Sequence, residues 1–186
     1  MQQAGMQSSR TGTWSLAWFE HDALAYSARI AVAATLSLLA ARILRMPEAY
    51  WAPVTTLMVI QSSVGAALTA SLRRFAGTAL GVATGALLAT YFGPNALAFG
   101  AGIFLLGILC ALMSRANRRL SQYFDRTAYL YAGNALAIVM LIVRYNSAWV
   151  VALHRFIEVS IGIAVGLALT LLWPERESAK GHNLLK

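Results

Sequence analysis

The stretch YWAPVTTLMVIQSSVGAALTASL, residues 50–72, contains no charged side chain. It is long enough to cross a bilayer, which takes about 20 apolar residues in a helix. It begins with an aromatic pair, Tyr50 and Trp51, of the kind that favours the membrane–water interface. Pro53 follows, and a proline is tolerated in the first turn of a helix because its missing N–H has no partner there. These residues predict a membrane helix that begins at the interface.

The same stretch is interrupted by a polar cluster, Gln61, Ser62, Ser63 and Gly65. Inside a bilayer, such residues permit a broken helix whose freed backbone groups line a cavity and do not face lipid. A helix N-terminus at the break has a partial positive charge and favours an anion. We therefore expect the cluster to line a path for an anionic solute.

The composition of the whole chain predicts a membrane protein. Of its 186 residues, 59% are hydrophobic and 12% are charged, half the ~25% charged residues of a soluble domain. We predict an all-α polytopic membrane protein with six transmembrane helices. A cytoplasmic or interfacial segment at 1–22 is expected to precede a membrane domain at 23–174, and a polar tail follows at 175–186. The six spans are expected near 24–43, 51–70, 75–92, 96–114, 127–143 and 156–173.

The net charge of +8 indicates membrane topology and not nucleic-acid binding, because the arginines gather at the ends of the expected spans. Cytoplasmic loops of membrane proteins collect Lys and Arg. If the N-terminus is placed on the cytoplasmic (inside) face of the membrane, ten Lys and Arg residues fall on that face and four on the opposite (outside) face. This distribution predicts that both termini are cytoplasmic. The inside set is Arg10, Arg73, Arg74, Arg115, Arg118, Arg119, Arg126, Arg176, Lys180 and Lys186, and the outside set is Arg42, Arg45, Arg144 and Arg155.

The chain offers no catalytic or cofactor-binding constellation. Its one cysteine, Cys110, excludes an internal disulfide and a cysteine metal cluster. The histidines are scattered, the serines lack a plausible base, and no phosphate-binding glycine loop is present. We therefore expect neither an enzyme nor a metal or cofactor, and any transport would draw on an ion gradient.

Two segments of the chain resemble each other at an offset of 81 residues: RFAGTALGVATGALLA begins at Arg74, and RFIEVSIGIAVGLALT begins at Arg155. A three-helix unit crosses the membrane an odd number of times, so its second copy is inverted relative to the first. We predict two inverted three-helix repeats, an arrangement in which two halves of a transporter expose a midplane site alternately to each side. The matching positions are Arg74 with Arg155, Gly81 with Gly162, Gly85 with Gly166 and Tyr50 with Tyr131.

Glycines recur four residues apart along the third and sixth expected spans. Such faces let helix backbones approach closely in lipid, where no hydrophobic drive favours association. We assign a structural role to the glycines of both faces, and also to Pro53, Gly65 and Arg155. The glycines of the two faces are Gly77, Gly81, Gly85, Gly162 and Gly166.

Polar side chains inside a membrane span are costly, so each one is a candidate for function. Two alternatives stay open for them. Arg74 and Arg155 can extend to the lipid headgroups, and Glu158 can serve only as a partner of Arg155, three residues earlier on the same helix face. The functional assignment gives substrate binding to Arg29, Gln61, Arg74 and Asn134, and proton coupling to Glu158.

Residues 50–81 also resemble the first-half signature of the fusaric acid resistance and aromatic acid exporter family. That signature runs Tyr-Trp-Ala, a Thr, a Gln, a Gly and then Arg-x-x-Gly-Thr-x-x-Gly. The resemblance implies a bacterial inner-membrane efflux protein for aromatic carboxylic acids, driven by the proton gradient. The matching positions are Tyr50, Trp51, Ala52, Thr55 or Thr56, Gln61, Gly65, Arg74, Gly77, Thr78 and Gly81.

The chain departs from this family pattern in one respect. Full-length exporters of the family usually have two such membrane segments and a soluble cytoplasmic region, whereas this chain has one segment. The resemblance therefore implies a homodimer or higher homo-oligomer in membrane lipid that exports a small organic anion. Two other hypotheses are kept: a passive organic-anion channel, and a non-transporting assembly subunit that supports a partner exporter.

Overall fold

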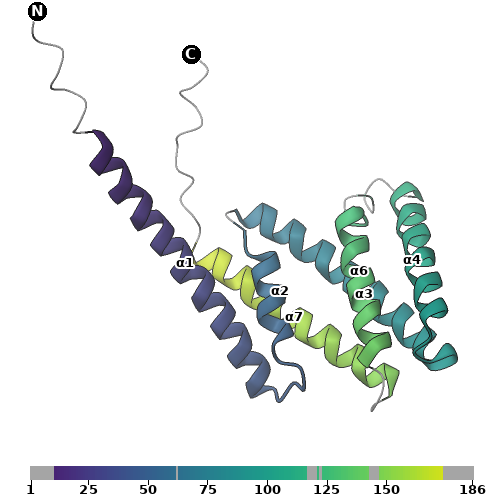
Figure 1. Ribbon diagram of the computed structural model, residues 1–186. Coiled ribbons are helices and arrows are strands. Elements are labelled where there is room, and N and C mark those ends of the chain that lie inside the picture. Colours follow the sequence, from purple (N-terminus) through teal and green to yellow (C-terminus); the bar gives the residue numbers. More distant parts are fainter. Residues whose placement is uncertain (1–10, 62, 117–120, 122, 143–146, 174–186) are drawn as a thin grey trace, which may run out of the picture.

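The computed structural model describes residues 11–61, 63–116, 121, 123–142 and 147–173, and all of the regular structure in these ranges is helical. Four helices are long and apolar enough to cross a membrane, α1 by its part Ala23–Ile43 and α4 by its part Ala96–Arg115. The helices, shown in Figure 1, are α1 (Thr11–Ile43), α2 (Trp51–Val59), α3 (Val64–Phe92), α4 (Ala96–Ala116), α6 (Arg126–Ile142) and α7 (Ala148–Leu172).

The helix break predicted at the polar cluster is confirmed. Helix α2 begins at Trp51, so Pro53 lies in its first turn as expected, and it ends at Val59 because Ile60 has an extended backbone. Helix α3 then begins at Val64, where the Ser63 hydroxyl accepts a hydrogen bond from the Ala66 N–H at 3.3 Å. Such a cap satisfies one of the free N–H groups at a helix start.

The expected boundary between the second and third spans is wrong. The sequence predicts that one span ends before Arg73 and Arg74 and that the next begins after them, but α3 runs through both residues without interruption. The charges are tolerated because each has a partner. Arg73 forms an ion pair with Asp125, and Arg74 stacks on the ring of Tyr131.

Helix α7 begins at Ala148, before the expected start at 156, so Arg155 and Glu158 lie inside it and not at its end. Helix α1 continues across the expected boundary at residue 23, and the expected tail at 175–186 lies outside the described residues.

Helix α6 is a shorter apolar helix, and the nine residues of α2 rise only about 14 Å, less than half the thickness of the hydrocarbon. Six transmembrane crossings therefore stay a prediction.

Helices α3 and α7 form the centre of the molecule. Helix α7 contacts α1, α2, α3 and α6, and helix α3 contacts α2, α4, α6 and α7. The rings of Phe75 and Phe156 contact each other across the α3–α7 interface, 4.9 Å between centroids. In Figure 1, α1 and α4 lie at opposite ends of the molecule and run in opposite directions. Helices α3 and α7, at the centre, also run in opposite directions.

Candidate functional site

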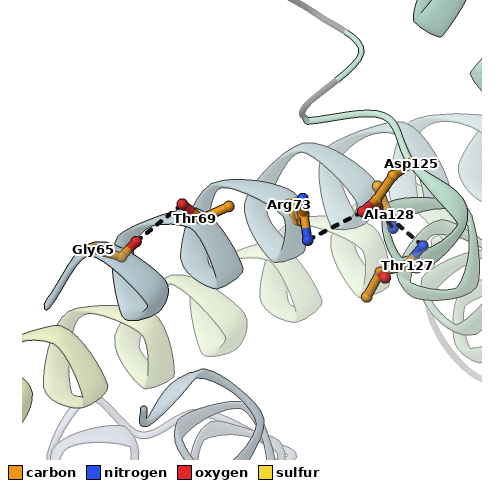
Figure 2. Close-up of polar contacts among 6 residues, drawn as sticks. All are labelled: Gly65, Thr69, Arg73, Asp125, Thr127 and Ala128. Atoms are coloured by element: carbon orange, nitrogen blue, oxygen red, sulfur yellow. Dashed lines mark hydrogen bonds and ion pairs between the residues drawn. The ribbon is translucent and has the colours of Figure 1, made fainter. Parts of the chain in front are cut away.

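A groove of about 450 Å³ opens beside the break between α2 and α3. Gln61 of the break and Arg73 lie at its two ends, with small residues of α3 between them. Figure 2 shows Gly65, Thr69 and Arg73 in a row along α3, with the Thr69 hydroxyl donating to the Gly65 carbonyl at 3.0 Å. The groove is therefore polar at both ends, and small side chains line its middle. The lining residues are Gln61, Gly65, Ala66, Thr69, Ala70 and Arg73.

Arg29 joins three parts of the chain behind this groove. Its Nη2 donates to the Gln61 carbonyl at 2.7 Å and to the Thr170 hydroxyl at 3.3 Å, and the residue is only 2% exposed. The helix break frees the Gln61 carbonyl, and the buried guanidinium satisfies it. The sequence predicts Arg29 and Gln61 at one site, and the structure brings them together. The contact with Thr170 is not predicted from the sequence.

Arg74 and Arg155 occupy matching positions on α3 and α7. The guanidinium carbon of Arg74 lies 4.5 Å from the ring centroid of Tyr131, and that of Arg155 lies 3.9 Å from the ring of Trp51. A guanidinium stacked at this distance is attracted by the ring, more strongly when water is excluded. Both residues are 2% exposed. In the part of the chain that the structure describes, Nε and Nη1 of each have no hydrogen-bond partner.

Glu158 is 1% exposed, and its Oε1 accepts a hydrogen bond from the backbone N–H of Glu48 at 3.1 Å. The Glu48 carboxylate in turn accepts from the Trp51 indole N–H at 2.8 Å. The helical spacing also allows an ion pair between Glu158 and Arg155, but the guanidinium turns to Trp51. No Arg155–Glu158 ion pair is present among the described residues.

The glycines of α3 and α7 mark where other helices approach most closely. A side chain at Gly81 would collide with the backbone carbonyl of Ala132 on α6, and one at Gly162 would collide with the carbonyl of Ala52 on α2. Gly77 is equally crowded by the Ala128 carbonyl, whereas Gly65 has open space around it. The packing role assigned to the glycine faces fits these contacts, and Gly65 instead lines the groove.

These contacts repeat between the two halves of the chain. Gly81 faces Ala132 and Ala135, as Gly162 faces Ala52 and Thr55; Gly85 faces Leu136 and Val139, as Gly166 faces Thr56 and Val59. The glycines differ by 81 positions, but their partners differ by 80. The contacts therefore match Tyr131 with Trp51, one residue away from the Tyr50 match expected from the sequence.

The other predicted substrate residues lie apart from Arg29 and Gln61. Arg74 faces Tyr131, and Asn134 is half-buried on α6, with no hydrogen bond in the described ranges joining either one to Arg29 or Gln61. From the sequence, Arg73 is only a topology signal, but in the structure it lies at the end of the groove. No group of three His, Cys, Asp or Glu residues within the described residues could hold a metal ion.

The helices long enough to span a bilayer, the broken helix and the buried arginines define the class as a polytopic membrane protein. The chain belongs to the fusaric acid resistance protein-like family, whose model matches residues 24–169.

Curated relatives that are similar to this chain include the following two proteins. The uncharacterized transporter YdhK of Escherichia coli K12 is 27% identical over 182 residues, covering 94% of this chain and 26% of the relative. YdhK of Salmonella typhimurium is 28% identical over 151 residues, covering 80% of this chain and 22% of the relative. The chain thus spans about a quarter of the length of the curated relatives it matches. No solved structure matches it.

Proposed function

We propose that this chain is a transporter that exports organic anions, with aromatic carboxylic acids as the substrate class. The family and the names of its relatives support a transporter rather than an enzyme. The choice of an anion depends on one observation, the excess of buried positive charge. Arg74 and Arg155 are each 2% exposed, and Glu158 is the only acidic residue buried to that extent within the described ranges. A dry protein interior is unfavourable for unbalanced cations, so an anionic solute is the natural complement.

The groove beside the helix break is the proposed substrate site. Its volume of about 450 Å³ lies within the ~300–1,000 Å³ of small-molecule sites. Gln61 offers an amide, Arg73 a guanidinium that also pairs with Asp125, and the start of α3 a partial positive charge. Arg29 holds the Gln61 backbone in place. Arg74 and Asn134 are proposed to contact the substrate in another conformation of the transport cycle.

Two inverted three-helix repeats would supply that second conformation. The repeated glycine contacts support this proposal, and so does the pattern of helix pairs. Exchanging α1, α2 and α3 for α4, α6 and α7 leaves the set of contacting pairs unchanged: α2 packs on α7 as α6 packs on α3. The opposite directions of α1 and α4 fit the inversion. Such halves can rock against each other around a shared site.

The chain is proposed to act as a homodimer or higher homo-oligomer in the bacterial inner membrane, with both termini in the cytoplasm. The bacterial relatives and the excess of inside arginines support this location. The proton gradient is the proposed energy source, with Glu158 as the coupling carboxylate.

The test is efflux of labelled aromatic acids from cells with and without the gene, across a panel of acids. Arg29→Gln removes the guanidinium behind the groove, and Arg42→Gln is its matched control on the exposed end of α1. We expect Arg29→Gln to slow efflux by about tenfold or more, a loss of ~1.4 kcal/mol of transition-state stabilisation, and Arg42→Gln to stay within about twofold of wild type at equal protein level.

Equal retention of every acid with and without the gene would count against export. Two further measurements separate the alternatives. Concentrative export stops when the proton gradient is collapsed, whereas flux through a passive channel continues. Purified protein that moves no acid in liposomes indicates an assembly subunit.

A further inference from the structure

A second, smaller cavity lies apart from the groove, between the α1–α2 turn and helices α6 and α7. Its volume is about 60 Å³, far below the ~300–1,000 Å³ of small-molecule sites but sufficient for at least two water molecules at ~30 Å³ each. An aromatic acid does not fit in it. The walls are Pro47, Glu48, Ile138, Ile142, Val151, His154, Arg155 and Glu158.

The charges on these walls differ from those of the groove. Two carboxylates, Glu48 and Glu158, face one guanidinium, Arg155, and one imidazole, His154. The two carboxylates would repel an organic anion, so the cavity does not fit the proposed substrate. It does not fit a metal ion either, since Glu48, His154 and Glu158 do not converge on a common point as a metal site requires. Water and an exchangeable proton suit all four groups.

Unpartnered donors also point to water in this cavity. Arg155 is 2% exposed, and its Nε and Nη1 have no partner in the described part of the chain. Buried polar groups of this kind are ordinarily satisfied by ordered water. Arg155 is a wall residue of this cavity, and its guanidinium is stacked on Trp51. Water inside the cavity would accept from these N–H groups.

We propose that this cavity is a hydrated proton-binding site, in which Glu158 takes up a proton from water and later returns it. In the uptake step a hydronium ion gives its proton to the Glu158 carboxylate and leaves as water. Glu48 and His154 are only partly buried, whereas Glu158 is 1% exposed. The proton therefore enters past Glu48 and His154 and stops at Glu158, whose Oε1 is held by the Glu48 N–H.

Other charged groups around Glu158 set the conditions for this step. The segment before α2 contributes Glu48 and Tyr50, α7 contributes His154 and Arg155, and α3 contributes the charge of Arg74 near Arg155. The wall residues of α6 are apolar, Ile138 and Ile142. Protonation of Glu158 removes one of the two carboxylate charges that act on Arg155, and this change beside the α3–α7 interface links the proton to the helices that would move.

The first test reads proton binding without transport. Trp51 donates to Glu48 and lies under Arg155, so its fluorescence should change when Glu158 titrates. In purified protein we expect a pH-dependent fluorescence step that is lost in Glu158→Gln and in Trp51→Phe. Glu158→Asp should retain a fluorescence step. Asp125 is a remote acid at the start of α6, so Asp125→Asn should show the same fluorescence step as the wild type.

Infrared difference spectra of the wild-type protein at two pH values keep the proposal testable if Glu158→Gln does not fold. A carboxylic acid band that shifts in heavy water is expected at low pH, and its absence would overturn the proposal. So would a Glu158→Gln protein that retains the full fluorescence step.

The second test rests on the proposed function and uses liposomes. We expect Glu158→Gln to retain downhill flux of a labelled aromatic acid within about twofold but to lose accumulation driven by a pH gradient by about tenfold or more. Gradient-driven accumulation at the wild-type level in this variant would overturn the proton site. Liposomes with wild-type protein that show no flux contradict the proposed function instead, while the fluorescence and infrared results still decide on the proton site.

Discussion

Gly81 shows how closely single residues control the packing of this chain. Its Cα faces the Ala132 carbonyl, and an added methyl group would also lie 2.8 Å from the Ala135 Cβ. The obstacle is backbone, which cannot move aside as the end of a flexible side chain can. Gly81 therefore permits α3 and α6 to approach in a way that no other residue allows.

Gly81→Ala should lower the free energy of unfolding by about 1–3 kcal/mol, the usual cost of overpacking. Gly100→Ala is the matched control, because Gly100 lies inside α4 with open space around it. There the same change should be neutral or stabilising by up to ~1 kcal/mol, since alanine is the better helix former. Unfolding in detergent followed by circular dichroism measures both, and equal effects at the two sites would contradict the packing argument.

At the residue scale, a local signal in the sequence was enough to select two of the candidate site residues. Gln61 interrupts an apolar stretch and Arg29 lies deep in one, so both could be selected without a structure. Their contact with Thr170 could not, because it joins positions 141 residues apart. Asn134 satisfied the same rule and lies away from the groove, which shows that burial of a polar residue does not specify its neighbours.

At the scale of elements, Asp125 determines where α6 begins and how it meets α3. Its Oδ1 accepts from the N–H groups of Thr127 and Ala128, both at 3.0 Å, and its Oδ2 pairs with Arg73 at 3.1 Å. Figure 2 shows these contacts joining the start of α6 to the middle of α3. One side chain is therefore both a helix cap and a surface ion pair.

Substitutions at Asp125 should separate these two roles. Asp125→Ala loses both and should lower the free energy of unfolding by about 1–2 kcal/mol. Asp125→Asn retains a capping oxygen and loses only the ion pair, so it should lower the free energy of unfolding by less than ~1 kcal/mol, as is usual for an exposed ion pair. Arg73→Gln also loses only the ion pair and should have an effect of similar size. Thermal unfolding in detergent at low and high salt measures these changes. An asparagine variant as unstable as the alanine variant would show that the ion pair dominates.

Helix limits were predictable only where the chain itself encodes them. Pro53 and Ser63 are local signals, and the start of α2 and the break before α3 follow from them. The length of α3 does not, because Arg73 and Arg74 resemble the end of a span until Asp125 and Tyr131 are known to meet them. Tertiary partners, and not composition, allow two arginines in the middle of this helix.

At the scale of the whole molecule, the proposed oligomer is open to direct measurement. One chain has a mass of 20.0 kDa. Native mass spectrometry of the purified protein released from detergent should give a multiple of that mass, with a dimer as the smallest species. A stable monomer in mild detergent and in lipid nanodiscs would contradict the proposal. The groove variant Arg29→Gln serves as a control, since it should leave the mass unchanged.

The exchange of partners between the two halves has a consequence for synthesis of the protein. Helix α2 packs on α7, the last described helix to leave the ribosome, and α6 packs on α3. The first three helices therefore enter the membrane before α2 has its main partner, and the Gly162–Ala52 contact forms only after α7 has been synthesised. During that interval the insertion machinery or lipid must cover the open face of α2, and a ribosome that stalls before α7 leaves a half that cannot close on itself.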